Sequence, residues 1–212
     1  MEFNQWMIVI TIAIVVVAAV LFITVSSFSS SKVLNPASGK NSTVTFSEAV
    51  SEFRNTTQSV LVHAIPEQNV LLYNGRDVNI VLLSASAQLS QNLTSRVPNA
   101  TVDGTALITG GLIYPEIEVP PGANLNITYI NLQTGDNCNL LISTVNPESF
   151  ASSPVQPSQQ LGAVFASPDL PPANDSRSAH KYSATIDSVN SDLWYSSDCV
   201  PSVYGHIAVS TS

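Results

Sequence analysis

Residues that carry metal, redox or phosphate chemistry are scarce in this 212-residue chain. It contains two cysteines, three histidines, two methionines and only seven lysines and arginines, against 15 aspartates and glutamates, for a formal net charge of −8. Without a basic stripe, nucleic acid is not an expected partner. Motifs such as G-x-S-x-G, H-E-x-x-H, C-x-x-C or a glycine-rich phosphate loop are also absent. We therefore do not expect an enzyme.

Charge is missing altogether from one long segment near the N-terminus. Residues 7–28 form a 22-residue uncharged stretch, which as an α-helix would be about 33 Å long and could cross a hydrocarbon core. A cleavable signal peptide typically has a basic start and a shorter apolar core, and this segment has neither. We predict a single transmembrane anchor over residues 1–28. A long signal sequence cleaved within residues 26–32 is the alternative.

Two signals disagree about the side of the membrane on which the remaining chain lies. Lys32 and Lys40 follow the apolar segment and no Lys or Arg precedes it, which by the positive-inside rule favours a cytoplasmic domain. The pairing expected for the two cysteines, described below, favours the extracytoplasmic side, and we give it more weight. Six Asn-X-Ser/Thr glycosylation sequons are compatible with an external domain. They begin at Asn41, Asn55, Asn92, Asn99, Asn126 and Asn174.

After the anchor, the sequence predicts a linker over residues 29–44 and one domain over residues 45–212. The linker is rich in Ser, Asn, Gly and Pro. Thr45 and Glu48 have capping-box spacing at the start of a short amphipathic helix, 45–55. From residue 57 onward, short apolar runs separated by turn residues predict an all-β sandwich or small barrel. The expected strands are 58–65, 69–73, 77–86, 105–110, 113–119, 124–132, 138–145, 161–167, 181–187, 193–199 and 206–211.

Two segments resemble sulfocyanins, a family of membrane-anchored blue copper proteins in the cupredoxin superfamily. Residues 111–143 (GLIYPEIEVPPGANLNITYINLQTGDNCNLLIS) resemble the strand, Pro-Gly turn and strand that lead to the family's first copper ligand, a histidine. Residues 193–206 (LWYSSDCVPSVYGH) resemble its C-terminal ligand loop, in which Cys, Val-Pro, Gly-His and Met follow an aromatic strand. The resemblance covers residues 70–212 and the anchor, and implies an antiparallel Greek-key β-sandwich of the cupredoxin type.

The resemblance also shows where this sequence departs from the family. A type 1 copper site needs one thiolate, two imidazoles and usually a weak axial thioether. Here the position that matches the first histidine is Cys138, and the position that matches the cysteine ligand is Cys199. His206 follows Cys199 after two residues more than usual, and Tyr204 stands at the usual histidine position. No methionine follows, because both methionines lie at the N-terminal end.

These departures imply a disulfide in place of copper. Cys138 and Cys199 have the strand parity of their core-facing neighbours, and the family's two ligands at these positions bind one metal ion. The resemblance therefore puts the two sulfur atoms in range of an S–S bond of about 2.05 Å. Paired cysteines outside the cytoplasm are more often a disulfide than free thiols. We expect a Cys138–Cys199 disulfide and no cofactor; copper bound by Cys199, His206 and Cys138 is the alternative.

The function implied is that of a sulfocyanin-like structural or accessory subunit of a respiratory membrane assembly. Membrane lipid and a membrane protein complex, or further copies of the chain, are the expected partners. One alternative is a true electron carrier with bound copper. Another is a subunit of an archaeal-type surface filament, because such subunits also carry a glycosylated β domain on a long apolar N-terminal helix.

Overall fold

A computed structural model describes residues 39–57, 62–94, 104–146, 162–174, 178–200 and 203–210. The expected anchor at 1–28, most of the expected linker and the sequon at Asn99 lie outside these ranges. Neither helix within the described ranges is both long and apolar enough to cross a bilayer.

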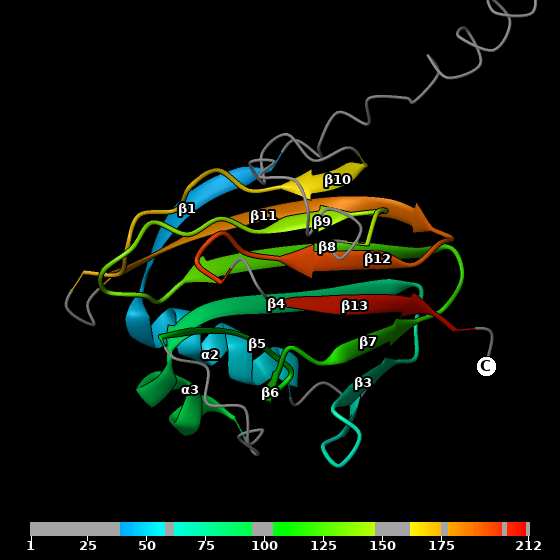
Figure 1. The fold of residues 1–212 in the computed structure, drawn as a ribbon, viewed down its shortest axis with the longest axis horizontal. Helices are drawn as coiled ribbons and strands as arrows, with labels where there is room; N and C mark the ends of the chain where they lie inside the picture. The colour runs from blue at the N-terminus through cyan, green and yellow to red at the C-terminus, as the bar shows by residue number, and fades with distance from the viewer. Residues whose placement is uncertain are drawn as a thin grey trace, which may run out of the picture. The chain divides into compact units, whose positions relative to one another are not determined.

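The described strands form two packed sheets (Figure 1). Sheet A has six strands, in the order β1 (Lys40–Thr45), β11 (Ser178–Val189), β8 (Ala123–Asn131), β4 (Asp77–Ser86), β5 (Thr105–Thr109) and β6 (Leu112–Ile113). Sheet B has seven, in the order β10 (Ala163–Ala166), β9 (Leu141–Ser143), β12 (Leu193–Ser196), β13 (Tyr204–Val209), β7 (Glu116–Val119), β3 (Val70–Tyr73) and β2 (Val62–Ile65). The expected all-β sandwich is confirmed.

The expectation of a wholly antiparallel sandwich is wrong in detail. Strand β4 runs parallel to β8 in sheet A, and β7 runs parallel to both β13 and β3 in sheet B. The reason is the chain topology: between the two strands of each parallel pair, the chain forms at least one strand of the other sheet. Between β4 and β8, for example, it passes through β7 in sheet B.

The core between the sheets comes from alternate residues of each strand. In β8, Leu125, Ile127 and Tyr129 are fully buried while the residues between them are only partly covered, as the alternation predicts. Facing them from sheet B are Leu193 and Tyr195 of β12. Tyr195 also explains why glycine stands at position 205 of the ligand-loop segment, because a Cβ there would overlap the tyrosine ring.

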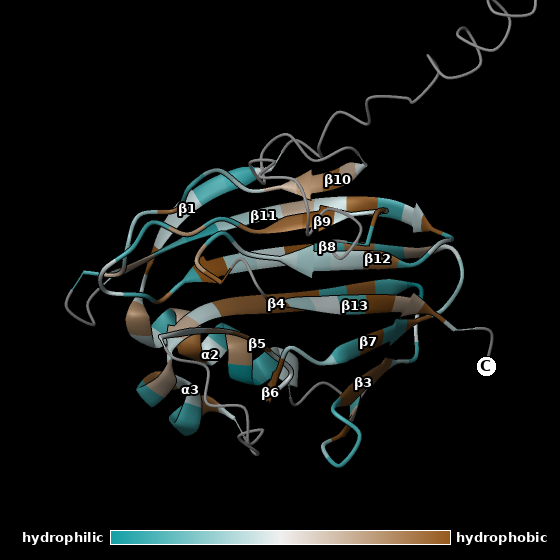
Figure 2. Cartoon of the chain, viewed as in Figure 1, coloured by the Kyte–Doolittle hydropathy of each residue, from teal (hydrophilic) through white to brown (hydrophobic). Residues whose placement is uncertain are grey.

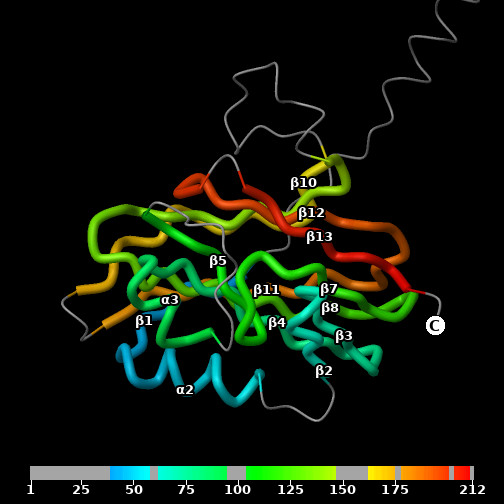
Figure 3. Tube along the Cα trace, turned by 60° about the horizontal axis from the view of Figure 1, so that its bottom comes forward, coloured from blue at the N-terminus to red at the C-terminus, as the bar shows by residue number. Residues whose placement is uncertain are grey.

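A helix adds a third layer over part of sheet A. Helix α2 (Phe46–Thr57) lies on the side of sheet A away from β12 and β13 (Figure 3). The helix covers the outward residues Val81 and Leu83 of β4, which are buried. Asn79, an outward residue nearer the start of the same strand, is exposed. Figure 2 shows the resulting hydrophobic stretch of β4. Lys181 of β11 fastens the helix through a 2.8 Å ion pair with Glu52.

The capping box predicted for this helix is present. The backbone N–H of Thr45 donates to Glu48 Oε2 at 2.8 Å, and the backbone N–H of Glu48 donates to Thr45 Oγ1 at 3.2 Å. The carboxylate of Glu48 accepts from the backbone N–H of Thr45 and also from its hydroxyl at 2.8 Å, and these two bonds lower the pKa of Glu48. Two other elements were not expected. Strand β1 begins within the range assigned to the linker, and a second helix, α3 (Ala87–Leu93), follows β4 with Ser86 as its N-cap.

Candidate functional site

The two cysteines meet at one end of the sandwich. Cys138 lies before β9 and Cys199 lies in the turn after β12, 61 residues further along the chain. A disulfide joins them, with a Cα–Cα distance of 5.5 Å. The predicted pairing is therefore confirmed. Cys138 is fully buried in the core, whereas Cys199 is partly exposed at its margin.

Backbone hydrogen bonds hold the Cys138 side of the bond. Its N–H donates to the Leu170 carbonyl at 3.1 Å, and the Leu170 N–H donates back to the Cys138 carbonyl at 2.9 Å. The side chain of Asn131, which is fully buried, donates from Nδ2 to the same Leu170 carbonyl at 2.9 Å. It also donates to the carbonyls of Asp136 at 3.0 Å and Pro171 at 3.2 Å. One buried amide thus fixes the loop before Cys138 against the loop that contains Leu170.

The Cys199 side is held by a tight turn and a carboxylate. The N–H of Val200 donates to the Ser197 carbonyl at 3.1 Å. The carboxylate of Asp198 accepts the backbone N–H of Asn139 at 2.8 Å, so it joins this turn to the segment that leads from Cys138 into β9. Cys199 Sγ also lies 3.3 Å from the carbonyl oxygen of Asn137. With both sulfurs in the disulfide, neither is available as a thiolate ligand.

Two buried tyrosines lie in the core near this end. Tyr129 shares a 2.6 Å hydrogen bond with the hydroxyl of Ser84, and Tyr195 donates to the Pro115 carbonyl at 2.7 Å. Burial raises the pKa of both phenols well above the ordinary value of 10.0. They are therefore neutral hydrogen-bonding groups that hold the interior, without acid–base chemistry at neutral pH.

His206 lies in a different environment from the cysteines. It pairs with Trp194 across β13 and β12, and the two rings stack with centroids 5.2 Å apart at 30°. Its Nδ1 is 3.4 Å from Glu116 Oε1, and its Nε2 is 3.5 Å from Asp192 Oδ2. Its neighbour Ile207 is fully buried in the core, so by strand alternation His206 faces outward.

The alternative copper ligand set is therefore not brought together. The two cysteines are bonded to each other, and the contacts of His206 are with Glu116, Asp192 and Trp194. Within the described ranges, no group of three or more His, Cys, Asp or Glu side chains is arranged to hold a metal ion. The residues present do not fit a type 1 copper centre, which needs a thiolate and two imidazoles at one point.

The carboxylates beside His206 were not predicted from the sequence as a site. Glu116 and Glu118 alternate with apolar residues of β7, which indicates a solvent-facing side of a strand and nothing about a partner. Asp192 lies in the turn between β11 and β12, and its approach to His206 depends on the packing of β13 beside β12. No local sequence pattern could therefore have predicted that these carboxylates lie beside His206.

The five sequons within the described ranges differ in accessibility. Four are exposed, at Asn41, Asn55, Asn92 and Asn174. The fifth, Asn126, is partly buried in a side-chain ladder across sheet A. Its Nδ2 donates to Asn79 Oδ1 at 3.2 Å, and its Oδ1 accepts from Thr185 Oγ1 at 2.9 Å. Both polar atoms of the Asn126 amide are therefore already engaged.

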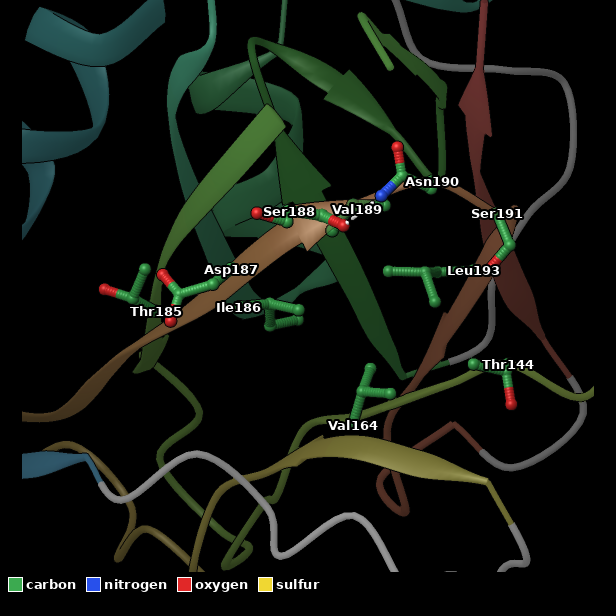
Figure 4. Close-up of a pocket in the computed structure, with 10 residues that line it drawn as sticks. All are labelled: Thr144, Val164, Thr185, Ile186, Asp187, Ser188, Val189, Asn190, Ser191 and Leu193. Atoms are coloured by element: carbon green, nitrogen blue, oxygen red, sulfur yellow. Dashed lines mark hydrogen bonds between the residues drawn. The ribbon is translucent and has the colours of Figure 1, made fainter. Parts of the chain in front are cut away.

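A cavity of about 490 Å³ opens where β11 ends and β12 begins (Figure 4). Ile186, Leu193 and Val164 point into a common space, and hydroxyl and amide side chains surround them. The register of β11 against β8 shifts between Ile186 and Val189, which turns the strand at the cavity margin. The cavity adjoins the end of β9 that is further from Cys138, so it is separate from the disulfide end.

Solved structures of rusticyanin share this two-sheet arrangement. Rusticyanin from Thiobacillus ferrooxidans, at 1.27 Å, aligns with a TM-score of 0.59 and 16% identity over 82% of this chain and 99% of that chain. Reduced rusticyanin at 1.9 Å aligns with a TM-score of 0.58 and 16% identity over 81% of this chain and 100% of that chain. The domain has a cupredoxin fold. A further structure, described as the copper protein rusticyanin at 2.1 Å, aligns with a TM-score of 0.56 and 17% identity over 82% of this chain and 99% of that chain.

At these identities the likeness establishes the fold and not the function. No protein-family profile matches the chain, and no curated protein matches it in sequence. A function has to be inferred from this chain's own residues, above all from the Cys138–Cys199 bond, and not from the cupredoxin fold alone.

Proposed function

We propose that this chain is a membrane-anchored, extracytoplasmic, sulfocyanin-like cupredoxin that carries a disulfide where its copper-binding relatives carry metal. In this proposal it is a structural or accessory subunit of a respiratory membrane assembly. The observation that carries the proposal is the bond between Cys138 and Cys199. These are the two positions that the sequence resemblance matches to the first histidine ligand and the cysteine ligand of copper.

The chemistry of the donor set supports a copper-free domain. A disulfide offers no thiolate, and the contacts of His206 lie with Trp194 and two carboxylates. The bond instead has a mechanical role, because it closes a loop of 61 residues. On the chain-entropy model, closure of a loop of this length stabilises the fold by about 4 kcal/mol. The disulfide would then replace the metal as the link between the two loops.

Two further observations support an extracytoplasmic location. Disulfides persist in oxidising compartments and are rare in the cytosol, and four of the glycosylation sequons are exposed. The anchor is expected from the uncharged segment at residues 7–28. Fractionation of cells tests this part, because the chain should be extracted from membranes by detergent and not by high salt or alkaline carbonate.

Thiol counting combined with copper reconstitution tests the central part. The denatured full-length chain should show no reactive thiol before reduction and two afterwards. The native chain, mixed with Cu(II) and desalted, should retain no stoichiometric copper and show no strong absorption near about 600 nm, the band of a Cu(II)–thiolate bond. A known blue copper protein, stripped and reloaded in parallel, is the control. Strong colour with bound copper would instead establish the electron carrier.

The accessory role needs a separate experiment. Mild detergent extraction followed by native electrophoresis should recover the chain in a complex with respiratory membrane proteins. Negative-stain microscopy of labelled membranes provides the opposite outcome, because filaments decorated by an antibody to this chain would identify a filament subunit and contradict the accessory role.

A further inference from the structure

The cavity at the end of β11 is bordered by two strands that are both irregular at this point. In β10, the register of pairing with β9 shifts around Val164. In β11, the register of pairing with β8 shifts between Ile186 and Val189. Such bulges redirect side chains, and Val164 points into the cavity beside Ile186 and Leu193 (Figure 4). One irregular strand belongs to each sheet, so the opening lies between the two layers of the sandwich.

The floor of the cavity is a part of the hydrophobic interior that the two sheets leave uncovered. Leu193 belongs to the core between the sheets, and Val164 and Ile186 pack against that core while remaining partly exposed. In a sandwich, inner side chains are normally covered by the opposite sheet. The volume of about 490 Å³ lies within the range of small-molecule sites, roughly 300–1,000 Å³. The floor can therefore bind an aliphatic group.

Polar groups surround this floor at the mouth of the cavity. Thr144 follows β9, Ser188 lies near the end of β11, and Ser191 lies in the turn before β12. Within the described ranges, neither the Ser188 hydroxyl nor the Ser191 hydroxyl has a hydrogen-bond partner. These hydroxyls can donate to and accept from a ligand. The arrangement is thus apolar inside and hydroxyl-rich at the mouth.

The lining also excludes charged ligands. None of the ten described residues that line the cavity is Lys, Arg or His, so a carboxylate or phosphate would find no opposite charge. None is aromatic, so a quaternary ammonium group would lack the ring faces that bind such cations. The one carboxylate, from Asp187, is exposed, and water screens its attraction for a cation. A neutral ligand is the class that fits.

We propose that this cavity binds a neutral amphiphile, with an aliphatic chain and a head group that carries hydroxyl and ester oxygens. The chain lies against Val164, Ile186 and Leu193, where it leaves water. The head group forms hydrogen bonds with the hydroxyls of Thr144 and Ser191 at the mouth.

The position of the cavity along the chain favours a ligand taken from a membrane. Strand β1, the first described element, pairs with β11 so that Lys40 lies opposite Ser183, two residues before the lining begins at Thr185. In the proposed function, the anchor ends at residue 28, and only residues 29–39 separate it from this strand in sequence. The inference rests on that proposed function for the source of the ligand alone. A chain that failed the fractionation test and still bound the amphiphile would contradict the anchor and not the cavity.

The test measures binding to the full-length chain held in solution by an amphipathic polymer, so that no free detergent competes. Equilibrium dialysis with mass spectrometry quantifies bound monooctanoylglycerol below its critical micelle concentration, and the polymer alone is the blank. Octanoate and octyltrimethylammonium have chains of the same length and charged heads. The neutral ligand should bind about tenfold more tightly than either, because the cavity offers no paired group for their charges. Equal binding of the three, or tighter binding of a charged one, would overturn the proposal.

Matched variants locate the bound chain. Val164→Trp fills the cavity from β10 and should weaken binding of monooctanoylglycerol by about tenfold or more, because the chain loses its apolar contact. Val62→Trp is the control. Val62 is also a partly buried valine packed against the core from an edge strand of sheet B, but it lies on β2 at the opposite edge. The control should change binding less than about twofold. Equal losses in the two variants would overturn the proposal.

A second cavity variant guards against misfolding of the first. Ile186→Gln keeps a side chain of similar length at a partly exposed position but makes the floor polar, and should also weaken binding by about tenfold. Retention of the disulfide and of the β-sheet circular dichroism shows that each variant is folded. Unchanged binding by a folded Ile186→Gln chain would overturn the proposal.

The double variant Thr144→Val, Ser191→Ala tests the head group. It removes two hydroxyls at exposed positions and leaves the apolar floor intact. The parent should prefer monooctanoylglycerol to methyl octanoate, which lacks the glycerol hydroxyls. In the variant this preference should fall to about twofold or less, because the hydrogen bonds at the mouth are lost. A folded variant with the preference of the parent would show that the head group does not bind at this mouth.

Discussion

Cys199 and His206 come from one short segment of sequence, yet the structure gives them opposite surroundings. Cys199 closes a disulfide at the end of the sandwich, where buried amides and backbone hydrogen bonds hold the loops. His206 lies on the outer side of sheet B, stacked on Trp194 between two carboxylates. Their separation in space follows from the strand that begins at Tyr204, because alternation along β13 sends His206 outward.

The comparison teaches that the two regions are stabilised in different ways. At the disulfide end, Cys138 and Asn131 are fully buried, and the bond from Asn131 to the Leu170 carbonyl is shielded from solvent. On the outer face, the charged groups are about half exposed, and water screens their interactions. Changes at the buried end should therefore cost much more stability than changes on the outer face.

The largest effect is expected from removal of the disulfide. The double variant Cys138→Ala, Cys199→Ala should lower the free energy of unfolding by about 4 kcal/mol, since the closed loop no longer restricts the unfolded chain. Denaturant unfolding followed by circular dichroism measures the change. Reduction of the parent chain with a dithiol should produce a similar loss. An unchanged unfolding midpoint after complete reduction would contradict this account of the bond.

Asn131 provides the next test. Asn131→Ala removes the donor shared by the carbonyls of Asp136, Leu170 and Pro171. It also removes the acceptor of the buried Gln133 N–H, so it should destabilise the domain by about 3 kcal/mol. Asn126→Ala is the control, since its amide lies in the partly exposed ladder of sheet A; it should cost less than about 1 kcal/mol. Similar costs for the two variants would show that burial does not distinguish these amides.

Alkaline pH should lower the stability of the fold through the tyrosines of the interior. Burial raises the pKa of Tyr114 to about 12, from an ordinary value of 10.0, and also raises those of Tyr73, Tyr129 and Tyr195. The unfolded chain loses these protons near pH 10 while the folded chain keeps them. Stability should therefore be complete below pH 10 and fall as the pH rises towards 12.

The ultraviolet absorption of tyrosinate, recorded together with circular dichroism, measures this behaviour. The four buried phenols should ionise in the same step as the loss of β structure. Ionisation of all six tyrosines while the sheets remain intact would contradict the burial of these side chains.

Much of the interior could be predicted from the sequence, because burial leaves a periodic pattern. The alternation at Leu125, Ile127 and Tyr129 gave strand β8 to within one residue at each end, and the spacing of Thr45 and Glu48 gave the helix start. The disulfide was predicted through a family resemblance and not through local physics. Two cysteines alone would not have shown how near their loops come.

The elements that the sequence did not reveal are those with weak or misleading patterns. Strand β1 is an edge strand that is mostly exposed. Its two partly buried residues are Ser42 and Val44, so only one apolar side chain marks the covered face and the segment looks like a linker. Helix α3 is seven residues long, contains mostly polar residues, and is too short for a helical period to stand out. The position of His206 depended on the register of β12 and β13, which is a tertiary property.

The smallest effect is expected at His206 itself, and it gives the sharpest contrast with Cys199. His206→Gln removes the ring that stacks on Trp194 and faces Glu116, interactions that at this exposure should stabilise the domain by less than about 1 kcal/mol. Denaturant unfolding of the variant should therefore be close to that of the parent, with no reactive thiol before reduction. The tryptophan emission should nevertheless change, because the stacking partner is lost; the substitution Trp6→Phe in both chains leaves Trp194 as the sole emitter. If His206→Gln instead released the two thiols or cost as much as the cysteine variant, the histidine would be part of the same structural centre as the disulfide, and the separation of the two regions would be wrong.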